Sequence, residues 1–304
     1  MRPRDRDRKH VVPVLRALGR GPLDPLPLAL AGHEEGVHDL RVGARRLRAA
    51  LPLLARKPFR PRVRNAVALL RRLGDIAGDA RDYDVMWGLL AAAPRPTGTA
   101  STPLLDRLRA RRARARRLLA ENLQALDLHA VQGAIGSVAA EDPELLFVVL
   151  VRLAQRRDAL VRDIHTRLKR ARHFRPDGLH RLRIRIRRLR YLAEMFAEIR
   201  GLRPAPGGLK VLQDALGAMQ DAWVLSRWLR REAALARRRR DLVSAALFAR
   251  QAERWTRLAR THHARFLTLD AQALIRGAVA GLGGRKHHGV AASLGSSRDV
   301  PVTP

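Results

Sequence analysis

The chain has 304 residues and a formal net charge of +33, from 61 basic and 28 acidic residues, and only five of the basic residues are lysine. So large a charge repels itself in a compact fold, and arginine binds phosphate through two parallel hydrogen bonds, so we expect a phosphate-rich polyanion as ligand. The absence of cysteine excludes disulfides, thiolate metal sites and thiol catalysis, and fits a cytoplasmic protein. No apolar run is long enough to span a bilayer and no signal core follows the basic start, so we expect no membrane partner.

Apolar residues recur with helical spacing along most of the chain, and glycine and proline separate the segments. No window alternates as strands do, so the sequence predicts an all-α fold. We expect residues 1–9 to be a disordered charged arm. The pattern then predicts helices at 11–18, at 35–55 with a kink or early end at Pro52, from about 63 onwards, and at 104–126.

The second half begins after a predicted hinge at 127–143, where Gly133, Gly136 and Pro143 interrupt the pattern. Helices are predicted at 144–174, 179–199, 209–240 and 242–281. Residues 283–304 have no apolar period, and we expect a disordered tail.

One stretch of the sequence is repeated. VHDLRVGARRLRAAL at 37–51 returns without a gap as LHRLRIRIRRLRYLA at 179–193. In both copies the apolar positions form one stripe of a helix: Val37, Leu40, Ala44, Leu47 and Leu51, repeated as Leu179, Leu182, Ile186, Leu189 and Ala193. Beside this stripe both copies carry one histidine and three arginines, here called the shared row: His38, Arg41, Arg45 and Arg48, repeated as His180, Arg183, Arg187 and Arg190.

The opposite flank of the repeated helix is not held in common. It reads Asp39, Gly43 and Arg46 in the first copy, against Arg181, Arg185 and Arg188 in the second. A cationic row that both copies keep beside the apolar stripe indicates a face partly enclosed by neighbouring helices, where cations need an anionic partner.

A fainter repeat pairs LGDIAGDARDYDVMWGLL from residue 73 with LQDALGAMQDAWVLSRWL from residue 212. It places four acids at repeated sites in a basic protein: Asp75, Asp82, Asp214 and Asp221. We expect these carboxylates to stand behind the ligand-binding arginines and hold them by ion pairs. The two repeats together predict two similar helical bundles in tandem, related by a pseudo-two-fold axis.

These motifs resemble the CHAD family, the conserved-histidine α-helical domain. The resemblance covers residues 10–282, with a first helical repeat at 10–130 and a second at 131–282. It implies two four-helix bundles about an approximate two-fold, with a basic central channel or groove that binds inorganic polyphosphate and is lined by the shared row. It also implies a stand-alone binder in the cytoplasm, with association with polyphosphate granules as a further expectation. Four more cations are candidates for additional phosphate contacts: Arg46, Arg71, Arg188 and Lys210.

Two other functions compete with polyphosphate binding. Non-specific binding of a nucleic-acid backbone fits the charge equally well, although aromatic residues make up only 4%, too few for an obvious stacking platform. A metal-dependent phosphohydrolase is disfavoured because the pair His38–Asp39 becomes His180–Arg181 in the second copy. We therefore expect no catalytic residues, metal or cofactor. The two histidines either pack and hydrogen-bond within the fold or donate to phosphate, with pH-dependent binding in the second case.

Overall fold

The computed structural model describes residues 3–55, 57–92, 102–126, 133, 136, 146–202 and 207–280. All regular structure in these residues is helical, and they contain no strand. The predicted all-α fold is therefore confirmed. The helices are α1 (Pro3–Arg20), α2 (Leu26–Leu30), α3 (Glu34–Leu54), α4 (Pro61–Ala92), α5 (Thr102–Gln124), α7 (Leu146–Arg170), α8 (Pro176–Arg200), α9 (Gly208–Arg238), α10 (Leu242–Leu267) and α11 (Ala271–Ala280).

Most predicted helices are found, but the amino terminus differs from the prediction. Helix α1 begins at Pro3, where a disordered arm was expected, and continues through Pro13. Pro3 stands in the first turn, where proline is tolerated, and apolar residues around Pro13, Val11 among them, are buried and anchor the helix to the core.

Helix ends also differ from the prediction at two internal places. Helix α3 continues past Pro52 to Leu54, so the early end expected there was wrong. The predicted helix at 242–281 is two helices, because the carboxylate of Asp270 accepts a hydrogen bond from the backbone of Ala273 (2.9 Å) and starts α11. The predicted hinge at 127–143, apart from residues 133 and 136, and the predicted tail at 283–304 lie outside the described residues.

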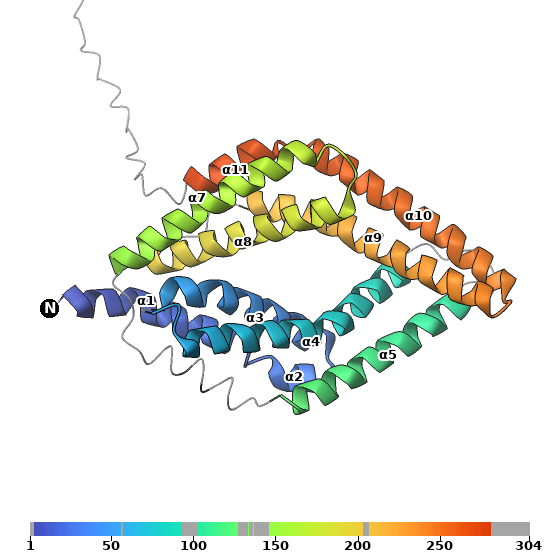
Figure 1. Cartoon of the computed structure of the whole chain (residues 1–304), viewed down its shortest axis with the longest axis horizontal. Coiled ribbons are helices and arrows are strands. Elements are labelled where there is room, and N and C mark those ends of the chain that lie inside the picture. Colours follow the sequence, from blue (N-terminus) through green and yellow to red (C-terminus); the bar gives the residue numbers. More distant parts are fainter. Residues whose placement is uncertain are drawn as a thin grey trace, which may run out of the picture.

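The helices of the two repeats lie on opposite sides of the molecule in Figure 1, with α1 to α5 on one side and α7 to α11 on the other. Helix α3 packs on α4, and its counterpart α8 packs on α9. Helices α3 and α8 also contact each other, as do α4 and α9, and α5 and α10. The repeated helices thus meet at the seam between the two halves.

The apolar stripe of the repeated helix is buried in both copies, from Val37 at 0% exposure to Ala193 at 9%. The largest hydrophobic cluster contains residues of α1, α3, α4, α7, α8, α9 and α11. A second cluster joins the end of α4 and the start of α5 to α9 and α10. The hydrophobic clusters therefore cross the boundary between the repeats, and the division into two separate bundles stays a prediction.

Within the described ranges, no helix is both long and apolar enough to cross a bilayer.

Candidate anion-binding site

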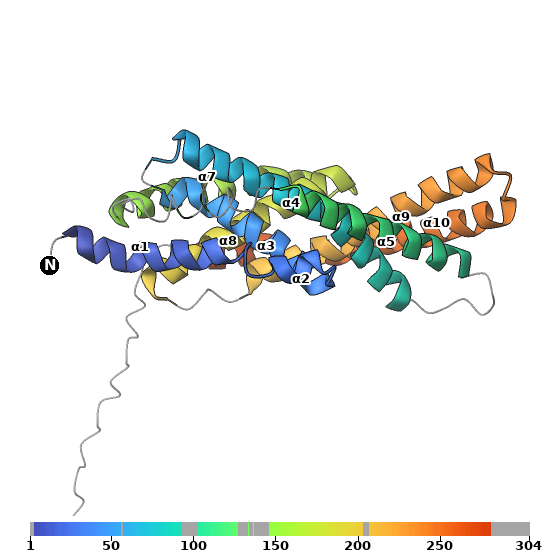
Figure 2. The ribbon, with the colours of Figure 1, turned by 90° about the horizontal axis from the view of Figure 1, so that it is seen from below.

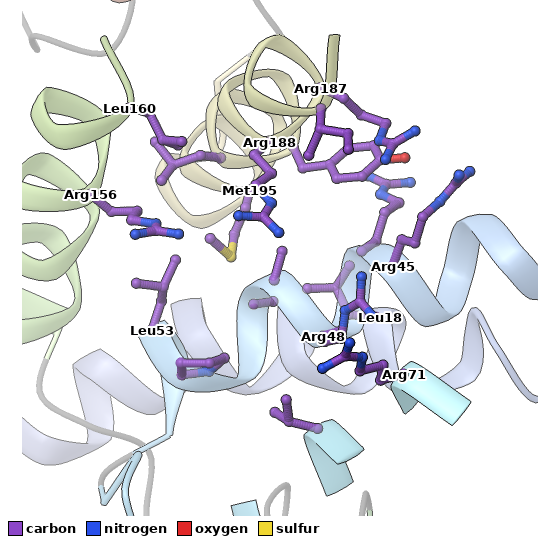
Figure 3. A pocket seen from close by; sticks show the side chains of 18 of the residues that line it. Leu18, Arg45, Arg48, Leu53, Arg71, Arg156, Leu160, Arg187, Arg188 and Met195 are labelled. Carbon is purple, nitrogen blue, oxygen red and sulfur yellow. The ribbon is translucent and has the colours of Figure 1, made fainter. Parts of the chain in front are cut away.

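A cavity of ≈ 800 Å³ lies at the seam between α3 and α8, with walls that include residues of α1, α4 and α7 (Figure 3). Seven of its lining residues are arginines: Arg45, Arg46 and Arg48 from α3, Arg71 from α4, Arg156 from α7, and Arg187 and Arg188 from α8. The apolar side chains in its wall include Leu18, Leu53, Val67, Leu160 and Met195. The cavity therefore combines a cationic lining with an apolar base.

Only part of the shared row reaches this cavity. Arg45, Arg48 and Arg187 line it, and three of the additional candidates, Arg46, Arg71 and Arg188, line it as well. The remaining members of the shared row do not line it: His38, Arg41, His180, Arg183 and Arg190.

Arg156 is a lining residue that the sequence analysis missed. It stands on α7, which carries neither of the two repeated motifs, so the comparison of copies gave it no signal. An arginine on an apolar helix is a weak signal in a chain with so many arginines. The contact between α7 and α8 places Arg156 at the cavity.

Five of the lining arginines form no ion pair with any carboxylate of the described part of the chain: Arg45, Arg48, Arg156, Arg187 and Arg188. The other two are paired. Arg46 contacts Glu194 at 3.3 Å and Glu198 at 3.5 Å, and Arg71 contacts Asp75 at 3.8 Å. The Nε atom of Arg45 is buried and has no hydrogen-bond partner within the described residues. The cavity thus gathers cations from three helices without the anions that would balance them.

The pKa values of these arginines also indicate an excess of positive charge in the cavity. Burial, followed by the charge of Arg45, lowers the pKa of Arg187 to about 9, although Tyr191 partly opposes the shift. Burial also lowers the pKa of Arg45 and of Arg188, and Arg156 is among the cations that lower the latter. A guanidinium remains charged at neutral pH even so, and each such charge is held at a cost in free energy that a bound anion would remove.

The arginines at the start of the shared row contact the neighbouring helix of their own repeat. Arg41 donates a hydrogen bond to the carbonyl oxygen of Gly78 and pairs with Asp82, both at 3.3 Å. In the second copy the Arg183 guanidinium lies against Gly217, where an added Cβ would stand 3.2 Å from Nη2. These residues correspond between the repeats, so an arginine of the shared row lies near the same glycine position in both copies, although the two contacts differ in detail.

A second cavity, of ≈ 310 Å³, lies beside this contact in the second half. It is lined by Arg183, Asp214, Gly217, Asp221 and His262, together with apolar residues such as Trp255. Burial raises the pKa of Asp221, the charge of Arg183 opposes the shift, and the charge of Asp82 adds to it. Asp82 of the first repeat and Asp221 of the second therefore lie near each other here.

The other two repeated acids form exposed ion pairs one helical turn along their own helices. Asp75 pairs with Arg71, and Asp214 pairs with Lys210 at 2.6 Å. Lys210 lines neither cavity, so its expected contact with a ligand at the seam finds no support in its position. The last member of the shared row, Arg190, pairs with Glu194 at 3.6 Å.

The two histidines stand near the arginines but outside both cavities. His38 is exposed and His180 is half-buried. Burial lowers the pKa of both, followed by the charge of Arg81 for His38 and of Arg183 for His180. The Nδ1 atom of His180 is buried and has no hydrogen-bond partner within the described residues. The surroundings of both imidazoles therefore disfavour the protonated form.

The unshared flank of the repeated helix has different neighbours in the two copies. A side chain at Gly43 would overlap the backbone of Gly21 and Pro22, because the turn between α1 and α2 packs directly on α3. At the corresponding position in α8, Arg185 pairs with Asp163 of α7. The flank diverged because the two copies pack against different elements.

Among the described residues, no group of three or more histidine, cysteine, aspartate or glutamate side chains is arranged to hold a metal ion.

The chain is similar to proteins of one family over most of its length. The family model described as the CHAD domain matches residues 23–230. The CHAD domain from the plant Ricinus communis has a similar structure, with 22% identity, a TM-score of 0.61, and coverage of 90% of this chain and 92% of that one. PptA from Streptomyces chartreusis is similar with 19% identity, a TM-score of 0.63, and coverage of 86% and 99%. Structures this distant in sequence show the fold alone. No curated protein matches the chain.

Proposed function

Because the chain belongs to the CHAD domain family, we propose that it binds inorganic polyphosphate in the cavity between α3 and α8. The observation that supports this most is the set of five lining arginines that have no carboxylate partner in the described part of the chain. Phosphate oxygens accept two parallel hydrogen bonds from one guanidinium, so a chain of phosphates suits such a set.

The distribution of the arginines favours a long ligand. Arg48 on α3, Arg156 on α7 and Arg188 on α8 belong to different helices, so a ligand with several phosphate groups can contact all three walls. A long polyphosphate chain offers a negative charge at every unit and can contact each helix in turn. We therefore expect long chains to bind far more tightly than triphosphate.

We propose binding without turnover. General acid–base catalysis needs a side chain that exchanges a proton near the working pH, and guanidinium groups do not. The acids in the cavity wall, Asp75 and Glu198, are ion-paired with Arg71 and Arg46. Release of phosphate from polyphosphate, abolished by changing these acids, would contradict this part of the proposal.

Nucleic acid is the competing polyanion. Binding of single strands commonly depends on bases that stack on aromatic side chains. The aromatic residue in the cavity wall is Tyr191, which is only 7% exposed and presents no ring face for stacking. This favours a bare phosphate chain over one that carries bases.

A competition titration at physiological salt tests the proposal, with long-chain polyphosphate against single-stranded and duplex DNA of equal charge. We expect polyphosphate to displace both DNAs, and its affinity to fall steeply with salt because each neutralised phosphate releases counterions. Equal competition by DNA would instead indicate a non-specific basic surface. Equal affinity for triphosphate and long chains would indicate a small pocket.

A further inference from the structure

The turn between α9 and α10 carries an unusual surface at one extreme of the molecule's long axis, opposite the amino terminus (Figures 1 and 2). Four consecutive arginines, 237–240, are all exposed there. Two aliphatic residues follow after one acid, Leu242 at 70% and Val243 at 84% exposure. Here we call residues 237–243 the hairpin tip.

The positive charge of the hairpin tip is not used within the fold. Within the described ranges, none of the four arginines forms an ion pair with a carboxylate. The one acid of the tip, Asp241, accepts a hydrogen bond from the backbone of Ser244 (3.0 Å) and pairs with Arg107 of α5 (3.5 Å). The arginines therefore remain available to an external anion.

The backbone at the tip holds one of these arginines in a conformation that favours glycine. Arg240 has a φ of 61°, the left-handed conformation that glycine adopts without strain after the end of a helix. Arginine at this position carries a local backbone cost that glycine would not. A charged side chain held at such a cost is consistent with a role in binding.

Core contacts hold the base of the hairpin in place, so the hairpin tip projects into solvent. Ala245, Leu247 and Phe248 are buried in the cluster that joins α9 and α10 to α5, and the guanidinium of Arg107 lies 5.0 Å from the ring centre of Phe248. The turn of helix that follows the tip is thus fixed by core contacts while Leu242 and Val243 point into solvent.

We propose that the hairpin tip docks on the surface of an anionic lipid bilayer, with the arginines among the lipid phosphates and Leu242 and Val243 inserted at the boundary of the acyl chains. A polyphosphate or nucleic-acid chain would use the arginines but leaves both aliphatic side chains in water. An anionic bilayer uses both, because it offers phosphates and an apolar layer a few ångströms beneath them. Such contact at the surface needs no spanning helix, and it would give the protein a membrane partner where the sequence predicts none.

Vesicle sedimentation with the full chain tests the proposal, using vesicles of phosphatidylglycerol mixed with phosphatidylcholine, and of phosphatidylcholine alone. We expect binding to the anionic vesicles only. Leu242→Ser/Val243→Ser changes no charge and should weaken that binding about tenfold, since it removes the inserted apolar area. The matched control, Phe59→Ser/Phe147→Ser, removes two other exposed apolar side chains (86% and 76% exposed) and should have no effect.

Charge is tested by a second matched pair of variants. Arg238→Gln/Arg239→Gln should weaken vesicle binding about tenfold or more, because each basic residue near an anionic surface contributes separately. Arg114→Gln/Arg117→Gln removes two exposed charges from α5 and should weaken it much less. Equal losses in the two variants would overturn the proposal, since they would mean that the whole basic surface coats the vesicle.

Insertion itself is measured by fluorescence. The chain has no cysteine, so Val243→Cys can be labelled at a single site with an environment-sensitive dye. We expect a blue shift on anionic vesicles and none with polyphosphate or duplex DNA. No shift on vesicles, or a loss of DNA binding equal to the loss of vesicle binding in Leu242→Ser/Val243→Ser, would overturn the proposal and identify the tip as a nucleic-acid contact. Polyphosphate affinity should be unchanged in every tip variant, which separates this test from that of the proposed function.

Discussion

Arg45 of α3 and Arg187 of α8 occupy corresponding positions in the two copies of the repeated helix and line the same cavity. Beyond the effect of burial, Arg45 is the cation that most lowers the pKa of Arg187. Neither guanidinium pairs with a carboxylate in the described part of the chain. Two like charges are thus held together at the place where the two halves of the protein meet.

Removing these two charges should change stability and binding in opposite directions. In Arg45→Gln/Arg187→Gln the repulsion at the seam is relieved, and we expect the free protein to gain about 1 kcal/mol, or about 2–4 °C in Tm. Polyphosphate binding should weaken by about 1.5–3 kcal/mol per lost charge-assisted contact. Thermal unfolding and a binding titration measure the two effects.

The control for this variant is Arg185→Gln, two residues away on the same helix but on the unshared flank. Arg185 pairs with Asp163, so its loss should lower stability and leave affinity nearly unchanged. A double variant that loses stability together with affinity would mean that the two arginines are structural.

A comparison of Arg188 with Arg190 separates position in the cavity from membership of the shared row. Arg188 belongs to the unshared flank but lines the cavity without a carboxylate partner, whereas Arg190 belongs to the shared row and pairs with Glu194. We expect Arg188→Gln to weaken polyphosphate binding about tenfold or more, and Arg190→Gln to change it by less than about 0.5 kcal/mol. A larger loss of affinity for Arg190→Gln than for Arg188→Gln in the titration would mean that the ligand binds along the shared row instead.

The protonation of His180 should respond to the ligand. Its pKa is lowered from 6.5 by burial, then by the charges of Arg183 and Arg187. A lowered histidine pKa contributes stability above pH 6.5 that is lost as the pH falls, because the folded state resists protonation. A polyanion that neutralises Arg187 should raise this pKa and bind more tightly as the pH falls below 6.5.

An NMR titration of the His180 ring protons measures this effect directly. We expect a pKa below 6.5 in the free protein and a higher value with polyphosphate. An unchanged value would place the ligand away from Arg187.

Two glycines inside helices should respond oppositely to the same substitution. At Gly78 an added Cβ meets nothing within 4 Å, so Gly78→Ala should stabilise the protein by about 0.5–1 kcal/mol through helix propensity. At Gly43 the Cβ would overlap the backbone of Gly21 and Pro22, and Gly43→Ala should cost about 1–3 kcal/mol or more. Chemical denaturation of both variants checks this, and a stable Gly43→Ala would show that the α1–α2 turn can move.

The repeat in the sequence predicted the buried side of α3 and α8 well, because a stripe such as Val37, Leu40 and Ala44 depends only on helical period. It could not predict which arginines share a cavity, since that depends on the neighbouring helices. Arg188 reaches the cavity from the unshared flank, Arg156 reaches it from a helix outside the repeat, and Arg190 does not reach it. The start of α1 at Pro3 was missed because burial of residues farther along, such as Val11, decides whether a charged segment is helical.

Two pairs of corresponding residues line the cavity, Arg45 with Arg187 and Arg46 with Arg188, so both copies of the repeated helix contribute cations to it. A ligand in the cavity would therefore meet equivalent cations on α3 and on α8. A nucleic-acid strand has a chemical direction, with different 5′ and 3′ ends, so its two orientations in such a site are not equivalent. A linear phosphate polymer reads the same from both ends, so we expect cations repeated on α3 and α8 to suit a ligand without polarity.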